Sequence, residues 1–194
     1  MTHPIEPLLT HLTEVFDEEA SARLTRELQK ISDVPTLLGL GKKYHDDIAG
    51  APVLRRVLQL EPNNEKALET LGAILVDHHV VDEAEKVLEK LRRLYPNNAT
   101  AYELTLALND LGSYLAGMEN WARKLRRLEP SNQRGVHYLA KLLAVQGQKK
   151  EALAELASAS SGDNLTDYDR RMIEFTRDAI ERDSLFTDKD YSWP

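Results

Sequence analysis

The residues in this 194-residue chain that are best placed to do chemistry are charged. Arg134, His137 and Lys141 fall at helical spacings of three and four, which puts three basic side chains on one face of one helix. Because the formal net charge is −7, this local basic line would attract an acidic segment of a partner. An exposed histidine in it would gain charge as the pH falls through about 6.5, which predicts tighter binding in mild acid.

Pairs of arginines form a second charged pattern. They are Arg55-Arg56, Arg92-Arg93 and Arg126-Arg127, and the last two pairs stand 34 positions apart. Such a ladder could bind phosphate groups, but these pairs fall in the expected last turns of helices, where each cation offsets the helix dipole by about 0.3–1 kcal/mol. The net negative charge also opposes binding to polyanions. We therefore interpret the pairs as structural and expect no nucleic-acid partner.

Metal binding and catalysis have little support in the sequence. His78 and His79 are adjacent, with Asp77 and Asp82 nearby, but neighbouring histidines in a turn rarely converge on one ion. The chain contains no cysteine, which excludes thiolate ligands and thiol nucleophiles. It has no phosphate-binding glycine loop and no nucleophile elbow. We therefore expect no metal site, no cofactor, no catalytic residues and no enzymatic activity.

The hydropathy pattern bears on the partners and the compartment. Purely apolar runs such as 73–76 are only a few residues long, whereas a bilayer needs roughly 20. The first residues show no basic leader followed by an apolar stretch, which would mark a secretory signal. These features predict a cytoplasmic protein with no membrane partner.

One short phrase recurs at a fixed spacing. Its copies are Leu60-Glu61-Pro62-Asn63-Asn64, Leu94-Tyr95-Pro96-Asn97-Asn98 and Leu128-Glu129-Pro130-Ser131-Asn132, and their prolines are 34 residues apart. A period of this length is typical of repeat proteins, in which each unit buries its apolar face by stacking on the next. Between the copies, leucines at helical spacing predict two amphipathic helices in each unit. The sequence therefore predicts an all-α fold made of helix pairs.

The unit between the first two copies resembles a known family. Its pattern Leu68-x2-Leu71-Gly72-x2-Leu75, then Ala84-x3-Leu88, then Pro96, is similar to the tetratricopeptide repeat. The resemblance implies a right-handed solenoid of antiparallel helix pairs. It divides the chain into N-terminal helices (1–30), four repeats (31–64, 65–98, 99–132, 133–164), a C-terminal capping helix (165–183) and a tail (184–194). The second and fourth repeats match the family pattern well, and the other two are degenerate.

The same resemblance implies a function. In tetratricopeptide proteins the first helix of each pair lines a concave groove that holds a peptide or a protein segment. The residues that would face this groove are Lys66, Glu69, Glu103, Arg134, His137 and Lys141. We therefore expect a non-catalytic adaptor or scaffold that captures a protein or peptide partner. The alternative for these positions is an ordinary solvated helix face, since charges at this spacing are common.

A second candidate surface lies on the helix expected from 113 to 128. Tyr114, Met118 and Trp121 form an apolar seam separate from the helix's other apolar stripe. A helix that is apolar around much of its girth is usually buried on two sides. The alternative is an interface, since Tyr, Trp and Met are enriched in interfaces. This seam, or the apolar tail, could then make the chain a structural homo-oligomerisation module.

Overall fold

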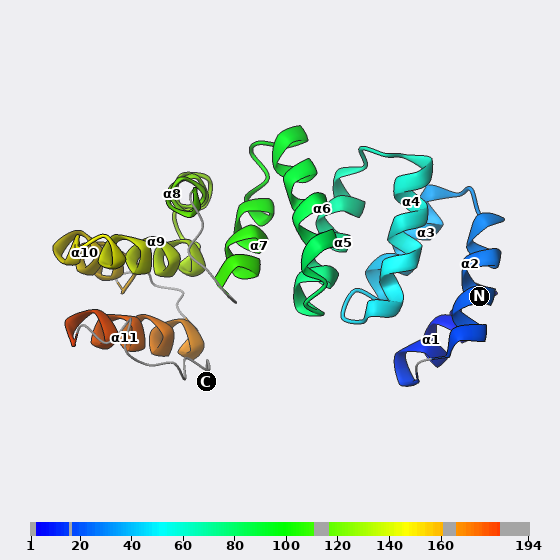
Figure 1. Cartoon of the computed structure of the whole chain (residues 1–194), viewed down its shortest axis with the longest axis horizontal. Helices are drawn as coiled ribbons and strands as arrows, with labels where there is room; N and C mark the ends of the chain where they lie inside the picture. The colour runs from blue at the N-terminus through cyan, green and yellow to red at the C-terminus, as the bar shows by residue number, and fades with distance from the viewer. Residues whose placement is uncertain (1–2, 16, 111–116, 161–165, 183–194) are drawn as a thin grey trace. The chain divides into compact units, whose positions relative to one another are not determined.

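The computed structural model describes residues 3–15, 17–110, 117–160 and 166–182, and within these ranges the chain is helical without any strand (Figure 1). The chain divides into two compact units, Met1–Leu108 and Asn109–Pro194. The first contains α1 (Glu6–Glu14), α2 (Glu18–Gln29), α3 (Val34–Lys43), the 3-10 turn η1 (Ile48–Gly50), α4 (Ala51–Leu60), α5 (Glu65–Asp77), α6 (Val81–Leu94) and most of α7 (Ala99–Asp110). The second contains α8 (Met118–Leu128), α9 (Gln133–Val145), α10 (Lys149–Ser160) and α11 (Asp167–Glu181). The all-α prediction is confirmed.

The recurring phrase forms the same turn at each of its three places. The side-chain oxygens of Asn64, Asn98 and Asn132 accept a hydrogen bond from the backbone N–H three residues later, at 2.9, 2.9 and 3.0 Å. The backbone N–H of each asparagine donates to the carbonyl three residues earlier, at 3.0 Å in every copy. Each asparagine thus caps the helix that follows it, because it satisfies a backbone donor that has no partner within the helix.

The helices that precede the three turns also end with the same hydrogen bond and a similar φ angle. The backbone N–H groups of Glu61, Tyr95 and Glu129 donate to the carbonyl four residues earlier, at 2.7, 2.8 and 2.8 Å. Their φ angles are −127°, −127° and −133°. A proline follows each of them, and the residue before a proline avoids the helical conformation. The three turns therefore share one backbone geometry, which the local sequence dictates.

The core of the first unit is built from the leucines that the sequence placed on helix stripes. Leu71 of α5 and Leu88 of α6 are buried, and α5 packs on α4 as well as on α6. Gly72 permits the contact between α5 and α6, since a Cβ there would lie 2.8 Å from Leu88 Cδ2. Leu104 of α7 joins the same core. Pro52 lies in the first turn of α4, which begins at Ala51, because proline is tolerated in a first turn but not in a helix interior.

In the second unit α9 is the central helix. It packs against α8, α10 and α11, and α11 also packs on α10. The helix expected from 113 starts only at Met118, directly after Gly117 with φ of 109°, and residues 113–116 lie outside the described residues. The start of α11 at residue 167 continues the period of the starts of α5, α7 and α9 at 65, 99 and 133.

Candidate functional site

The predicted site residues of the first unit lie on α5 and α7. Lys66 is exposed and its Nζ atom lies 3.2 Å from Oε1 of the half-buried Glu69. Glu103 of α7 is also half-buried. The two helices are neighbours, since Leu104 lies close to Gly72. Here we call these three residues, which lie on α5 and α7, the first-helix face.

The predicted basic line of the second unit is not exposed as a whole. Arg134 is exposed, but His137 and Lys141 retain only 2% and 7% of their accessible surface. The expectation that all three face solvent is wrong for these two, because both lie buried in the packing of α9 against its neighbours, with His137 against Thr176 of α11. The sequence pattern placed the three side chains on one helix correctly but could not show what covers that helix.

His137 makes a specific contact under α11. Its Nδ1 atom lies 2.7 Å from Oγ1 of Thr176, which is itself buried. The Thr176 hydroxyl donates its only proton to the carbonyl of Met172 at 2.8 Å. The hydroxyl oxygen must then accept, so Nδ1 of His137 carries a proton and donates it.

The charge of His137 follows from this burial. Loss of hydration, and then the nearby Lys141 cation, lower the pKa of His137 from 6.5 to about 3. The imidazole is therefore neutral at pH values where an exposed histidine would be charged. The expected gain of charge near pH 6.5, and with it tighter binding of an acidic segment through His137, is corrected by this finding.

The apolar seam is only partly present on the surface. Met118 is buried and Trp121 is half-buried, while Tyr114 lies outside the described residues. Trp121 packs near Gly117, where a Cβ atom would lie 3.7 Å from the indole ring. Of the three seam residues, Trp121 is thus the one with a described exposed portion.

Several of the arginines connect neighbouring helices. Arg55 of α4 holds the carboxylate of Glu83 in α6 with two hydrogen bonds of 2.7 and 2.6 Å, and this contact lowers the pKa of Glu83. Arg126 of α8 contacts Glu155 and Ser158 of α10, at 3.3 and 3.0 Å. The planar guanidinium offers several donors in fixed directions, so one arginine can hold both oxygens of a carboxylate, as Arg55 does, or two side chains, as Arg126 does. These contacts favour the structural interpretation of the arginine pairs.

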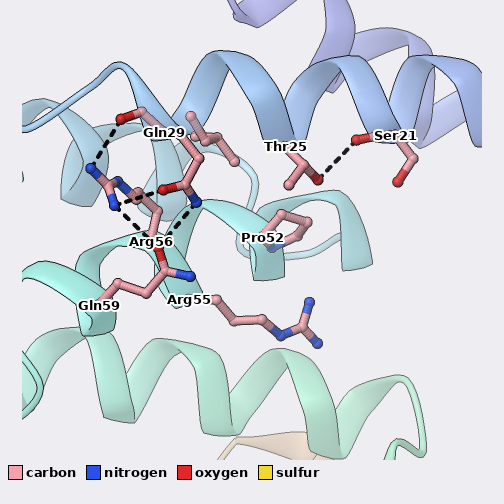
Figure 2. A pocket seen from close by; sticks show the side chains of 8 residues that line it. Ser21, Thr25, Gln29, Pro52, Arg55, Arg56 and Gln59 are labelled. Atoms are coloured by element: carbon pink, nitrogen blue, oxygen red, sulfur yellow. Dashed lines mark hydrogen bonds between the residues drawn. The ribbon is translucent and has the colours of Figure 1, made fainter.

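Sequence reasoning missed a polar pocket of about 250 Å³ between α2 and α4 (Figure 2). It is lined by Ser21, Thr25, Leu28, Gln29, Pro52, Arg55, Arg56 and Gln59. Its α2 half lies in the N-terminal segment, outside the repeated pattern, and its α4 half lies about thirty residues further on. The available signal was the pair Arg55-Arg56, which was expected in the last turn of a helix. That expectation is wrong for this pair, because Arg55 and Arg56 lie in the middle of α4 and its last turn carries no basic residue.

Within the described ranges, no group of three or more metal-binding side chains comes together. His78 ends α5, and His79 adopts a left-handed conformation with φ of 56°. None of the described helices is both long and apolar enough to cross a bilayer.

The chain matches no protein-family model, and it has no match among curated proteins. Three features of the molecule bear on its function: the three equivalent turns, the first-helix face and the pocket between α2 and α4.

Proposed function

We propose that this protein is a non-catalytic adaptor whose helix pairs form a right-handed, tetratricopeptide-like solenoid. The observation that carries the proposal is the set of three turns with one hydrogen-bond pattern, at 34-residue intervals. Equal spacing and equal turns are what a stack of similar units requires. The helix α11 also begins 34 residues after the start of α9, which continues the same interval.

The surface proposed for the partner is the first-helix face of the first unit. On α9, His137 is covered by α11 and Lys141 is also buried, which leaves Arg134 as the exposed residue of the basic line. On α5, in contrast, Lys66 is exposed and its pairing with Glu69 is a surface ion pair. Such pairs contribute about 0–1 kcal/mol, so a partner can replace this contact at little cost.

The distribution of shifted pKa values supports a binding role rather than catalysis. Active sites concentrate groups with displaced pKa values in a cleft. Among the described residues, the carboxylates with lowered pKa values are held by ordinary contacts, such as Glu6 with Lys43 and Glu119 with Gln146 and Arg123. The large displacement at His137 arises inside the packing between α9 and α11.

The test compares two charge-reversed proteins. Glu69→Lys with Glu103→Lys alters the first-helix face, whereas Glu85→Lys with Glu89→Lys makes the same charge change on exposed positions of α6. Partners captured by the wild type are identified, and their affinities for all three proteins are measured by calorimetry. We expect at least a tenfold loss for the first variant and little change for the control. Equal affinities would place the binding surface elsewhere.

The self-assembly alternative is tested with a further variant. A stable homo-oligomer in solution whose formation depends on Trp121 or on residues 184–194 would favour a structural module over an adaptor. The burial of Met118 removes one of the three seam residues from such an interface. Solution mass, measured by light scattering on the wild type and on Trp121→Ala, separates the two functions.

A further inference from the structure

The pocket between α2 and α4 carries two guanidinium groups and no carboxylate among its eight lining residues. Arg55 and Arg56 are adjacent in sequence, but their guanidinium groups point in different directions: that of Arg56 lies beside Gln29, and that of Arg55 points away from it (Figure 2). Arg55 is paired with Glu83, so the uncompensated positive charge of the pocket comes from Arg56, in a protein whose formal net charge is −7. Such a pocket favours an anionic group.

Arg56 is fixed in place by neutral acceptors. Its Nε and Nη2 atoms donate to the carbonyls of Ile31 and Gln29, at 3.2 and 3.1 Å. Its Nη1 atom donates to the side-chain oxygens of Gln29 and Gln59, both at 3.1 Å. Within the described part of the chain no carboxylate forms an ion pair with Arg56. The guanidinium is therefore rigid but keeps its full charge, which reduces the entropy lost when an anion binds beside it.

The other polar groups of the pocket leave hydrogen-bond donors available. The oxygen of Gln59 accepts from Arg56 and also from Nε2 of Gln29 at 3.2 Å, which fixes the amide orientation. The Gln59 amide nitrogen is then a donor, and Figure 2 shows it on the side of Arg55. Arg55 uses two of its five N–H groups on Glu83. A surplus of donors over free acceptors selects a ligand that brings acceptors, such as a carboxylate.

We propose that this pocket binds a carboxylate side chain of an acidic peptide segment in a partner protein. The volume of about 250 Å³ is below the roughly 300–1,000 Å³ of small-molecule sites, so it suits one side chain rather than a whole cofactor. Leu28 is buried and Pro52 half-buried, and both supply apolar lining for the methylene groups. The surface is separate from the first-helix face, and the inference does not depend on it.

The experiment measures fluorescence anisotropy of a short labelled peptide that alternates glutamate with serine. A matched peptide has glutamine in place of glutamate, and inorganic phosphate is the competing small anion. Wild type should bind the glutamate peptide and not the glutamine peptide. Saturation by phosphate, without binding of the glutamate peptide, would overturn the assignment to a peptide segment.

Two pairs of variants locate the site. Thr25→Glu places a carboxylate in the pocket, while Ala22→Glu adds the same charge on an exposed position of α2 outside it. Arg56→Gln removes the fixed cation, while Arg26→Gln removes an exposed one of the same helix pair. We expect Thr25→Glu and Arg56→Gln to weaken binding about tenfold or more, and the controls to stay within about twofold.

Folding of each variant is checked by circular dichroism. If Arg56→Gln unfolds α2, the comparison of Thr25→Glu with Ala22→Glu decides alone, because Thr25 is exposed and its hydroxyl donates to Ser21 O at 3.0 Å within its own helix. Equal weakening by the pocket variant and its control would show that net charge, not the pocket, attracts the peptide. Failure of wild type to bind at millimolar peptide would also overturn the proposal.

Discussion

Nδ1 of His137 in α9 and Oγ1 of Thr176 in α11 form a buried hydrogen bond of 2.7 Å. The bond joins the central helix of the second unit to the helix that covers it. Loss of the Thr176 hydroxyl would leave the His137 N–H without its acceptor in a place that water does not reach. The pair is therefore a sensitive point for the docking of α11.

Thr176→Val should destabilise the second unit by about 1–3 kcal/mol, because the buried His137 N–H loses its acceptor while the side-chain shape is kept. Thr176→Ser, which keeps the hydroxyl, should lose less. Urea denaturation followed by circular dichroism, together with hydrogen exchange in α11, measures the effect. The control is Thr25→Val at an exposed position, expected to stay within about 0.5 kcal/mol. Equal midpoints for the two valine variants would contradict the buried bond.

Acid should weaken the folding of the second unit through His137. The pKa is 6.5 in the unfolded chain and about 3 in the fold, so the unfolded state binds more protons between these values. The stabilisation is complete above pH 6.5 and declines as the pH falls toward 3, by up to about 1.4 kcal/mol per pH unit. His137→Gln removes this titration. Denaturation midpoints of wild type and variant should converge as the pH is lowered, and parallel curves would refute the assignment.

Two glycine substitutions should have different effects. A Cβ on Gly39 of α3 would meet no atom within 4 Å, so Gly39→Ala should stabilise the fold by up to about 1 kcal/mol through helix propensity. A Cβ on Gly72 would lie 2.8 Å from the buried Leu88, so Gly72→Ala should lose about 1–3 kcal/mol relative to it. Thermal denaturation compares the two. Equal stabilisation by both would mean that α5 and α6 are less tightly packed than described.

The capping asparagines should contribute similarly because their geometry is the same. Asn64→Ala and Asn98→Ala should each cost about 0.5–2 kcal/mol, since a helix donor loses its acceptor. Asn63→Ala, one position earlier and exposed, is the matched control. Chemical denaturation monitored by circular dichroism gives the three values. A cost at Asn63 equal to that at Asn64 would contradict the cap assignment.

Local features of the fold could be predicted from the sequence because their causes lie within a few residues. Pro52 set the start of α4, and the leucine stripe containing Leu71 identified the core. The surroundings of His137 could not be predicted in this way. They depend on Thr176, which lies 39 positions away and has no feature that marks it as the residue covering α9.

The pocket between α2 and α4 was missed for a similar reason. Thr25 and Gln29 look like ordinary polar residues on the outside of a helix, and their meaning appears only when Arg56 lies beside them. The division into two units near Leu108 was also not apparent, because the repeat period continues across it. Periodicity shows which units are alike but does not show how tightly each packs on the next.

The equivalence of the turns has a consequence for how the chain can change in length. Removal of residues 65–98 would join Asn64 directly to Ala99, and the backbone N–H three positions after that asparagine would again belong to an alanine, Ala101 instead of Ala67. The cap would re-form at the new junction from the same atoms. Deletion or duplication in steps of 34 residues therefore preserves the helix-starting signals.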